Sequence, residues 1–196
     1  MQSQTVGIYS LTWVFQTLYH TLPKEQRKPP SMISSHMTLY HATGADEAST
    51  IVLTFPTSTP SNSAPPAESQ AISMTHLRVS TDPDELQTAG ASVKIQATKG
   101  EIQVFGPPFR PEKYRVIPAK KPEGIRTVES SFPGNGKGMY WEADEVARCI
   151  RDGKLESDVL PWQESIVIMD VMDEARREGG LVYPEKIEST KYPVQL

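Results

Sequence analysis

The stretch that decides the fold runs from Pro133 to Glu188 and reads PGNGKGMYWEADEVARCIRDGKLESDVLPWQESIVIMDVMDEARREGGLVYPEKIE. Its first half predicts a helix, because apolar residues recur at spacings of three and four and would form one stripe: Met139, Ala143, Val146, Ala147 and Ile150. Asp144 and Arg148 lie four residues apart on another face. Gly153 is a typical left-handed terminator of such a helix.

The second half predicts another helix, which opens near Pro161 and ends at Gly179-Gly180. Its apolar stripe consists of Ile168, Val171, Met172 and Ala175. Glu164 near the start and Arg176 and Arg177 near the end suit the helix dipole. Together the two patterns predict two amphipathic helices that pack on a flat apolar surface. This arrangement is a structural scaffold and not a functional site.

Composition limits the function classes. A chain of 196 residues with a hydrophobic content of 37% predicts one domain over residues 1–196. The net charge of −4 does not favour binding to nucleic acid or to an anionic membrane, because both are negatively charged. No apolar run reaches the length of a membrane span. The single Cys149 lies beside the apolar stripe, where we expect a buried structural thiol, and it indicates a reducing compartment, the cytoplasm.

The rest of the chain is rich in strand signals. A helix is expected over residues 7–22, with Ile8, Leu11, Phe15, Leu18 and Leu22 on one face. The expected strands cover residues 32–40, 49–55, 72–79, 113–118 and 124–132, with a hairpin whose alternating residues Val93, Ile95, Ala97, Ile102 and Val104 share one buried face. Polar loops are expected at 56–70 and 80–90. Strands in runs with helices at both ends predict an α+β fold with a mostly antiparallel open sheet and helices packed on one face.

The two quoted helices also carry a resemblance. GMYWEADEVARCIRDGKLES and LPWQESIVIMDVMDEARREGGLVYP resemble the C-terminal end of the Gfo/Idh/MocA oxidoreductases, in the branch of dimeric dihydrodiol dehydrogenase and fungal NADP-dependent D-xylose 1-dehydrogenase. VGIYSLTWVFQTLYHTLP and VKIQATKGEIQVFGPPFRP resemble earlier parts of the same domain. The resemblance implies a C-terminal substrate and dimerisation domain, whose free sheet face packs against a second subunit to give a homodimer.

A nicotinamide enzyme needs a strand, a glycine-rich turn and a helix N-terminus that holds the pyrophosphate. No GxGxxG string occurs, and Gly134-Asn135-Gly136-Lys137-Gly138 has another spacing and follows Pro133. That string precedes a helix, so an anion-binding role stays open beside a loop or cap role. We therefore expect no cofactor-binding residue and no Rossmann domain in this chain, and NADP is implied by the resemblance alone. The lysine of the family's Glu-Lys-Pro motif has no match either, because Lys121-Pro122 lacks the Glu.

One catalytic position has a match. In the family motif LLDxGxY the tyrosine is an acid/base at the sugar hydroxyl, and the corresponding string here is SQTVGIY, Ser3 to Tyr9. Tyr9 and Gly7 match, and Thr5 stands where the family has Asp. The resemblance implies that Tyr9 accepts the proton of the substrate hydroxyl. The alternative is an aromatic residue at the start of a helix that touches the core. The four histidines show no metal-ligand spacing, so no metal site is expected.

Two hypotheses of function follow. In the first, the chain is the C-terminal part of an NADP-dependent oxidoreductase that acts on the CH–OH group of a sugar or a cyclic diol, with D-xylose and a trans-dihydrodiol as candidates. It lacks the nucleotide-binding half and is inactive alone. In the second, it is a non-catalytic module that dimerises through the open sheet face.

Overall fold

The computed structural model describes residues 3–56, 68–80, 82–84, 86, 88–120 and 124–191. Its helices are α1 (Ser3–Phe15), α2 (Tyr140–Arg151), α3 (Trp162–Gly179) and α4 (Glu185–Glu188), and its strands are β1 (Met32–Leu39), β2 (Asp46–Pro56), β3 (Glu68–His76), β4 (Val93–Ala97), β5 (Gly100–Phe105), β6 (Lys113–Pro118) and β7 (Arg126–Glu129). Most of the polar loop predicted at 56–70, and Lys121-Pro122, lie outside the described residues.

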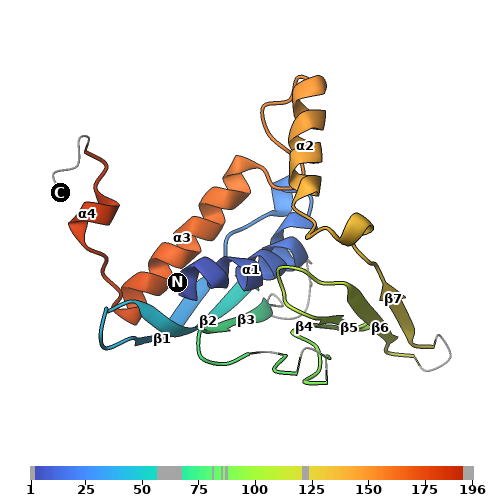
Figure 1. Ribbon diagram of the computed structural model, residues 1–196, viewed down its shortest axis with the longest axis horizontal. Helices are drawn as coiled ribbons and strands as arrows, with labels where there is room; N and C mark the ends of the chain where they lie inside the picture. The colour runs from blue at the N-terminus through green and yellow to red at the C-terminus, as the bar shows by residue number, and fades with distance from the viewer. Residues whose placement is uncertain are drawn as a thin grey trace, which may run out of the picture.

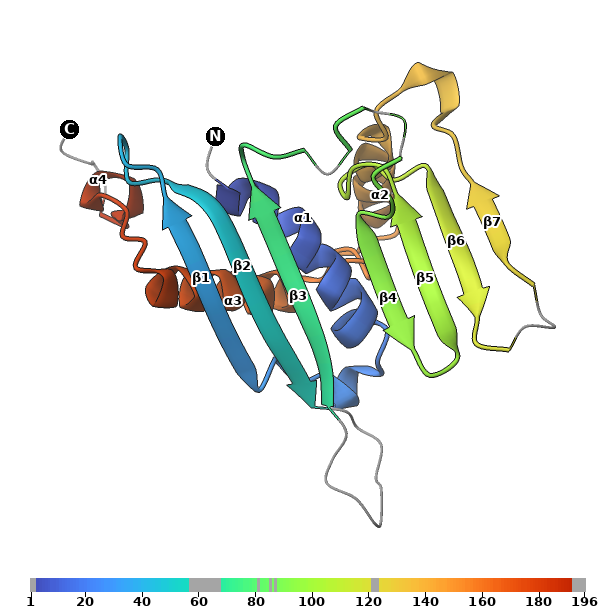
Figure 2. The ribbon, with the colours of Figure 1, turned by 90° about the horizontal axis from the view of Figure 1, so that it is seen from below.

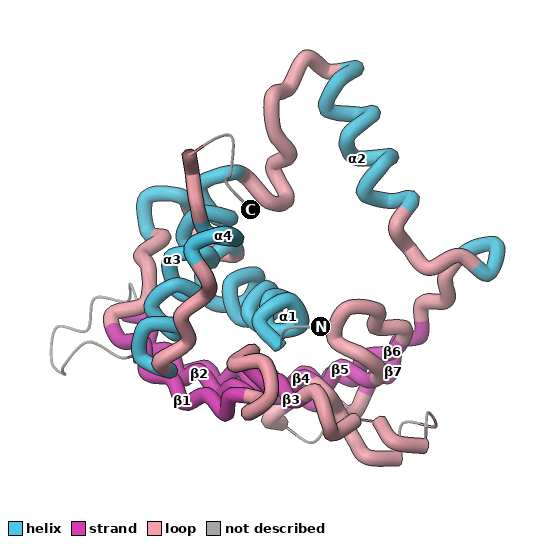
Figure 3. The backbone as a smooth tube through the Cα atoms, turned by 60° about the vertical axis from the view of Figure 1, so that its left-hand side comes forward, coloured by secondary structure: helices cyan, strands magenta, loops and turns pink. Residues whose placement is uncertain are grey.

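The described strands form two antiparallel sheets, one in the order β1-β2-β3 and one in the order β4-β5-β6-β7. The edges β3 and β4 lie beside each other (Figures 2 and 3). This confirms the α+β class with open antiparallel strands, although the strands are divided between two sheets rather than joined in one. In the β4–β5 hairpin Ala97 pairs with Gly100, which has a φ of +144°. A Cβ there would lie 2.2 Å from the carbonyl oxygen of Ile117, so only glycine fits this turn.

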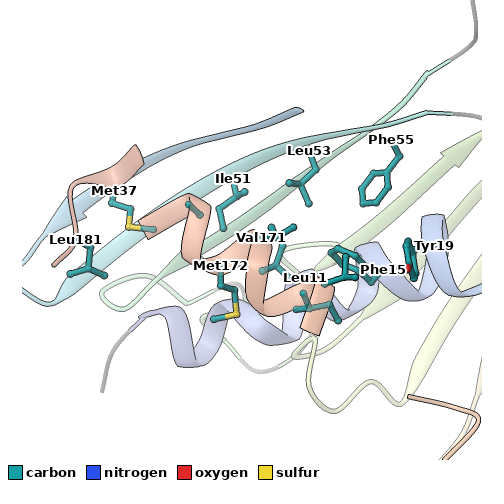
Figure 4. Packing of buried hydrophobic residues seen from close by; sticks show 13 residues of the cluster. Leu11, Phe15, Tyr19, Met37, Ile51, Leu53, Phe55, Val171, Met172 and Leu181 are labelled. Carbon is teal, nitrogen blue, oxygen red and sulfur yellow. The ribbon is translucent and has the colours of Figure 1, made fainter. Parts of the chain in front are cut away.

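The core lies between the three-stranded sheet and two helices. Helices α1 and α3 cover the same face of β1–β3 (Figure 1). Leu11 and Phe15 from α1 meet Leu53 and Phe55 from β2, and the rings of Phe15 and Phe55 are edge-on with centroids 5.6 Å apart (Figure 4). The predicted stripe of α3 is buried, with exposures of 3% at Ile168, 2% at Val171, 9% at Met172 and 0% at Ala175. Each large buried side chain contributes about 1.5–3 kcal/mol of hydrophobic free energy.

The first helix differs from the prediction over residues 7–22. It starts earlier, at Ser3, and the α-helix ends at Phe15, where the π-helical turn Gln16–His20 follows. This wider turn shifts the register of the side chains, so Tyr19 is the next residue buried in the core and Leu18 is only partly buried. The hydroxyl of Thr17 donates to the carbonyl of Trp13 at 2.7 Å, a local bond that accompanies such irregular turns.

The prediction that both C-terminal helices pack on a flat apolar surface is wrong for α2. No residue of α2 is buried. The predicted stripe faces solvent, with exposures of 72% at Met139, 57% at Val146 and 73% at Ile150. Figures 1 and 3 show α2 standing away from both sheets. A periodic pattern identifies the face that needs cover but not the element that covers it, and within the described residues nothing buries this face of α2.

The predicted buried face of the β4–β5 hairpin is confirmed only in part. Val93 pairs with Val104 and Ile95 with Ile102, as the alternation predicts. Val104 is 3% exposed, whereas Ile102 is 37% exposed. The main contacts of α1 and α3 are with β1–β3 rather than with this sheet, which leaves part of the hairpin face uncovered.

Candidate functional site

Tyr9 is held by small residues that bring α1 close to β3. Gly7 is buried, and a Cβ at this position would lie 3.8 Å from Cγ2 of Thr75. The hydroxyls of Ser10 and Ser73 are hydrogen-bonded at 2.5 Å. These contacts fix the turn of α1 that carries Tyr9, whose side chain remains 43% exposed.

The ring of Tyr9 packs against Phe109, which lies in the turn between β5 and β6. The two centroids are 5.3 Å apart at an interplanar angle of 49°, and Phe109 is 59% exposed. This turn is tied to α1, because the indole Nε1 of Trp13 donates to the carbonyl of Pro108 at 2.8 Å. Tyr9 therefore lies beside a second aromatic side chain on a rigid, solvent-exposed surface.

The surface continues toward the start of α2. The guanidinium of Arg110 lies 5.2 Å from the centroid of Phe132, and its Nη2 donates to Glu112 at 2.6 Å. Phe132 packs on Trp141 at 5.2 Å, and Trp141 packs on Tyr140 at 5.0 Å. The rings form two groups, Tyr9 with Phe109 and Phe132 with Trp141 and Tyr140, and Arg110, the residue after Phe109, links them through its contact with Phe132. We call the two groups together the aromatic cluster. Sequence reasoning missed Phe109 and Phe132, and the available signal was an aromatic residue in each of two Pro- and Gly-containing turns.

The glycines of the string 134–138 make room for this cluster. Gly138 has a φ of +86°, and a Cβ there would lie 2.5 Å from Cε1 of Phe132. A Cβ on Gly136 would lie 2.9 Å from Cε1 of Tyr140. The close approach of backbone to ring accounts for both glycines, which favours the loop role over an anion site.

The described residues do not fit a dinucleotide. Every strand pairing among them is antiparallel. A pyrophosphate site of the Rossmann type needs a parallel strand that leads through its glycine turn into a helix. The string 134–138 instead follows β7, an antiparallel strand at the end of its sheet.

Other candidates of the sequence are structural. Cys149 is partly buried, and this burial together with the neighbouring Glu145 carboxylate raises the pKa of its thiol, which disfavours the reactive thiolate. Among the residues that the structure describes, no cluster of three His, Cys, Asp or Glu side chains could hold a metal ion. His41 packs edge-on against Tyr40 at 5.1 Å, and His36 lies on the solvent side of β1.

A buried polar contact that the sequence did not predict joins the π-helical turn after α1 to α3. Glu164, in the first turn of α3, is 1% exposed. Its carboxylate lies 2.6 Å from Nδ1 of His20 and accepts a hydrogen bond from Nε2 of Gln16 at 3.2 Å. The contact fixes the two core helices relative to each other.

Comparison with known proteins identifies relatives of the chain. It is 48% identical over 193 residues to D-xylose 1-dehydrogenase (NADP(+)) of Hypocrea jecorina, which covers 95% of this chain and 46% of the relative. It is 32% identical over 96 residues to human trans-1,2-dihydrobenzene-1,2-diol dehydrogenase, with 48% of this chain and 28% of the relative covered. The zebrafish (Danio rerio) dihydrodiol enzyme is 38% identical over 71 residues, or 31% of this chain and 21% of the relative. These matches confirm the resemblance to both kinds of dehydrogenase.

The chain spans less than half the length of these curated relatives. No family model matches the chain, and no solved structure matches it. Of the helices in the described ranges, none is long and apolar enough to cross a membrane.

Proposed function

We propose that this chain is the substrate-side part of an NADP-dependent oxidoreductase of the Gfo/Idh/MocA family, which acts on the CH–OH group of a sugar or a cyclic diol. The observation that carries the proposal is the 48% identity to the Hypocrea D-xylose 1-dehydrogenase over nearly the whole chain. D-xylose is the first substrate to test. The single Cys149 supports a reducing location, the cytoplasm.

We propose that residues outside the described part of this chain hold the cofactor. The described residues offer antiparallel strands and a glycine string packed against aromatic rings, so we assign none of them to NADP. NADP would supply the hydride chemistry in the complete enzyme. The part contributed by this chain is the aromatic cluster, where Tyr9, in its deprotonated phenolate form, accepts the proton of the substrate hydroxyl and becomes the neutral phenol, and Phe109 holds the Tyr9 ring in place.

A nucleotide-binding half needs a surface on which to dock, and the exposed apolar stripe of α2 provides one. Helix α3 also carries exposed apolar residues, with exposures of 69% at Trp162, 52% at Ile166 and 50% at Met169. An isolated helix as short as α2 is marginally stable in water, so a partner that covers Val146 and Ile150 would also stabilise it.

The test joins this chain to the nucleotide-binding half of the Hypocrea relative and follows NADPH formation with D-xylose. We expect the joined protein to reduce NADP and the isolated chain to be inactive. Introducing Ile150→Asp into the joined protein should lower its activity by weakening the docked interface, whereas Leu155→Asp, at a 93% exposed position of the next loop, is the matched control. Binding of NADP by the isolated chain with the affinity of a complete dehydrogenase would contradict the proposal.

A second function, homodimerisation, is supported by the free face of the three-stranded sheet. Strand alternation places Glu68 at one end of the face opposite the core. Three further rows of this face carry no formal charge apart from histidine: Ser34-Val52-Ile72, His36-Thr50-Met74 and Thr38-Ala48-His76. Ile72 and Met74 are 65% and 67% exposed. A face with few charges and with large exposed apolar side chains suits a self-complementary contact between two copies.

Sedimentation of the purified chain tests the dimer. We expect a dimer for the native sequence and a monomer for the double variant Ile72→Asp/Met74→Lys, with unchanged circular dichroism. Leu155→Asp, away from the sheet, should leave the dimer intact. A native protein that is folded and strictly monomeric would exclude this second function.

A further inference from the structure

We propose that a cleft at the turn between β1 and β2 binds a neutral polyhydroxylated ligand, a pentose or hexose, at a site separate from Tyr9. The cleft has a volume of about 530 Å³ and is lined by residues of this turn, the start of β2 and the two residues that follow β3, chiefly Tyr40, Thr43, Glu47, Leu77 and Arg78. Its size lies within the usual range of small-molecule sites.

Backbone hydrogen bonds hold the walls of the cleft in place. The amide of Tyr40 donates to the carbonyl of Ala45 at 2.7 Å, and the amide of Gly44 donates to the carbonyl of Tyr40 at 2.8 Å. The amide of Leu77 donates to the carbonyl of Glu47 at 3.0 Å, which fixes the end of β3 against β2. The site is therefore largely formed before a ligand arrives, which lowers the entropy cost of binding.

The polar wall is an ion pair that still has hydrogen-bonding capacity. Nε of Arg78 donates to the carboxylate of Glu47, and the guanidinium lies 5.9 Å from the centroid of Tyr40. A guanidinium has five N–H donors and a carboxylate about four acceptor positions, so one bond between them leaves several of each. The hydroxyls of a sugar can donate to the carboxylate and accept from the guanidinium while the pair stays intact.

The apolar wall suits the other side of a sugar. Tyr40 is 38% exposed and Leu77 is 43% exposed, so both offer apolar surface to the cleft. The C–H face of a pyranose packs against an aromatic ring or an aliphatic side chain. An aromatic wall beside a paired donor and acceptor is thus complementary to a ligand that has both C–H faces and hydroxyls.

The charges of the cleft favour a neutral ligand over an anionic one. The guanidinium of Arg78 is already paired with the carboxylate of Glu47. A sugar phosphate would compete with Glu47 for Arg78 and would meet the Glu47 carboxylate, whereas a free sugar avoids both costs.

The cleft and the aromatic cluster share no residue. The cleft is lined by the β1–β2 turn, whereas Tyr9 contacts Phe109 in the turn between β5 and β6. These two turns lie apart in Figure 2. Binding at the cleft is consequently independent of the proposed dehydrogenase activity and can be tested on this chain alone.

The experiment is a titration of the isotope-labelled full chain with D-xylose, followed by amide chemical shifts. We expect saturable shifts at residues 40–47, 77 and 78 with a dissociation constant of about a millimolar. Arg78→Leu and Tyr40→Ala should each weaken binding about tenfold or more, because each removes one wall. Leu155→Asp, at a 93% exposed position outside the lining, is the control and should bind as the native chain does.

Three results would overturn the proposal. The first is the absence of shifts at the cleft when the sugar is far above a millimolar. The second is a set of shifts confined to the region of Tyr9 and Phe109. The third is inorganic phosphate moving the cleft amides with equal or higher affinity. If Tyr40→Ala does not fold, the Arg78→Leu variant decides the question, because the Arg78 side chain is 62% exposed and its removal leaves the core intact.

Discussion

Replacing Tyr9 with phenylalanine should lower kcat of the joined dehydrogenase by about a hundredfold or more, the usual effect of removing a positioned acid or base. Phenylalanine keeps the ring that packs on Phe109 at 5.3 Å, so the local structure and the substrate surface should persist. We therefore expect KM for D-xylose to change much less than kcat, because the lost hydroxyl acts mainly in the transition state. Steady-state kinetics of NADPH formation measure both constants.

Tyr140→Phe is the matched control for this variant. Tyr140 belongs to the same aromatic cluster and is 37% exposed, close to the 43% of Tyr9, but it lies at the other end of the cluster. Removal of its hydroxyl should leave kcat within about twofold of the native value. If Tyr9→Phe also kept kcat within that range, Tyr9 would be a packing residue and the proton would leave by another group.

The parts of the fold that could be predicted from sequence are those whose partners lie nearby in the described chain. The stripe of α3 and the pairing of Val93 with Val104 follow from periodicity, because the sheet and the neighbouring strand are present to satisfy them. The stripe of α2 has the same periodicity and is exposed, with Ile150 at 73%. The pattern alone does not distinguish a helix packed on its own domain from one that needs another partner.

Less of the candidate site than of the fold could be predicted from the sequence. Tyr9 came from a motif resemblance, and its catalytic role remains a prediction. Phe109 and Phe132 reach the aromatic cluster from two turns that are far from Tyr9 in sequence, and no local pattern relates the three positions. The pairing of His20 with Glu164 could not be predicted either, because it depends on how the π-helical turn after α1 meets the first turn of α3.

Replacing Glu164 with alanine should lower the free energy of unfolding by about 3 kcal/mol, the order expected when one partner of a buried charged contact is lost. The carboxylate is 1% exposed, so alanine would leave Nδ1 of His20 and Nε2 of Gln16 without their acceptor and would create a cavity between the π-helical turn after α1 and the start of α3. Urea denaturation of the purified native chain and of the variant at neutral pH measures this difference in the free energy of unfolding.

Two further variants separate hydrogen bonding from packing at Glu164. Glu164→Gln keeps the size and one acceptor oxygen, so it should lose less than half as much stability as the alanine variant. Glu174→Ala removes a carboxylate on the surface of the same helix, where it pairs with Arg177, and should leave the urea midpoint unchanged. Equal losses for Glu164→Ala and Glu164→Gln would mean that the negative charge itself, rather than an acceptor in the right place, holds the two core helices together. A loss for Glu164→Ala no larger than that of Glu174→Ala would mean that water enters the gap and replaces the carboxylate at little cost.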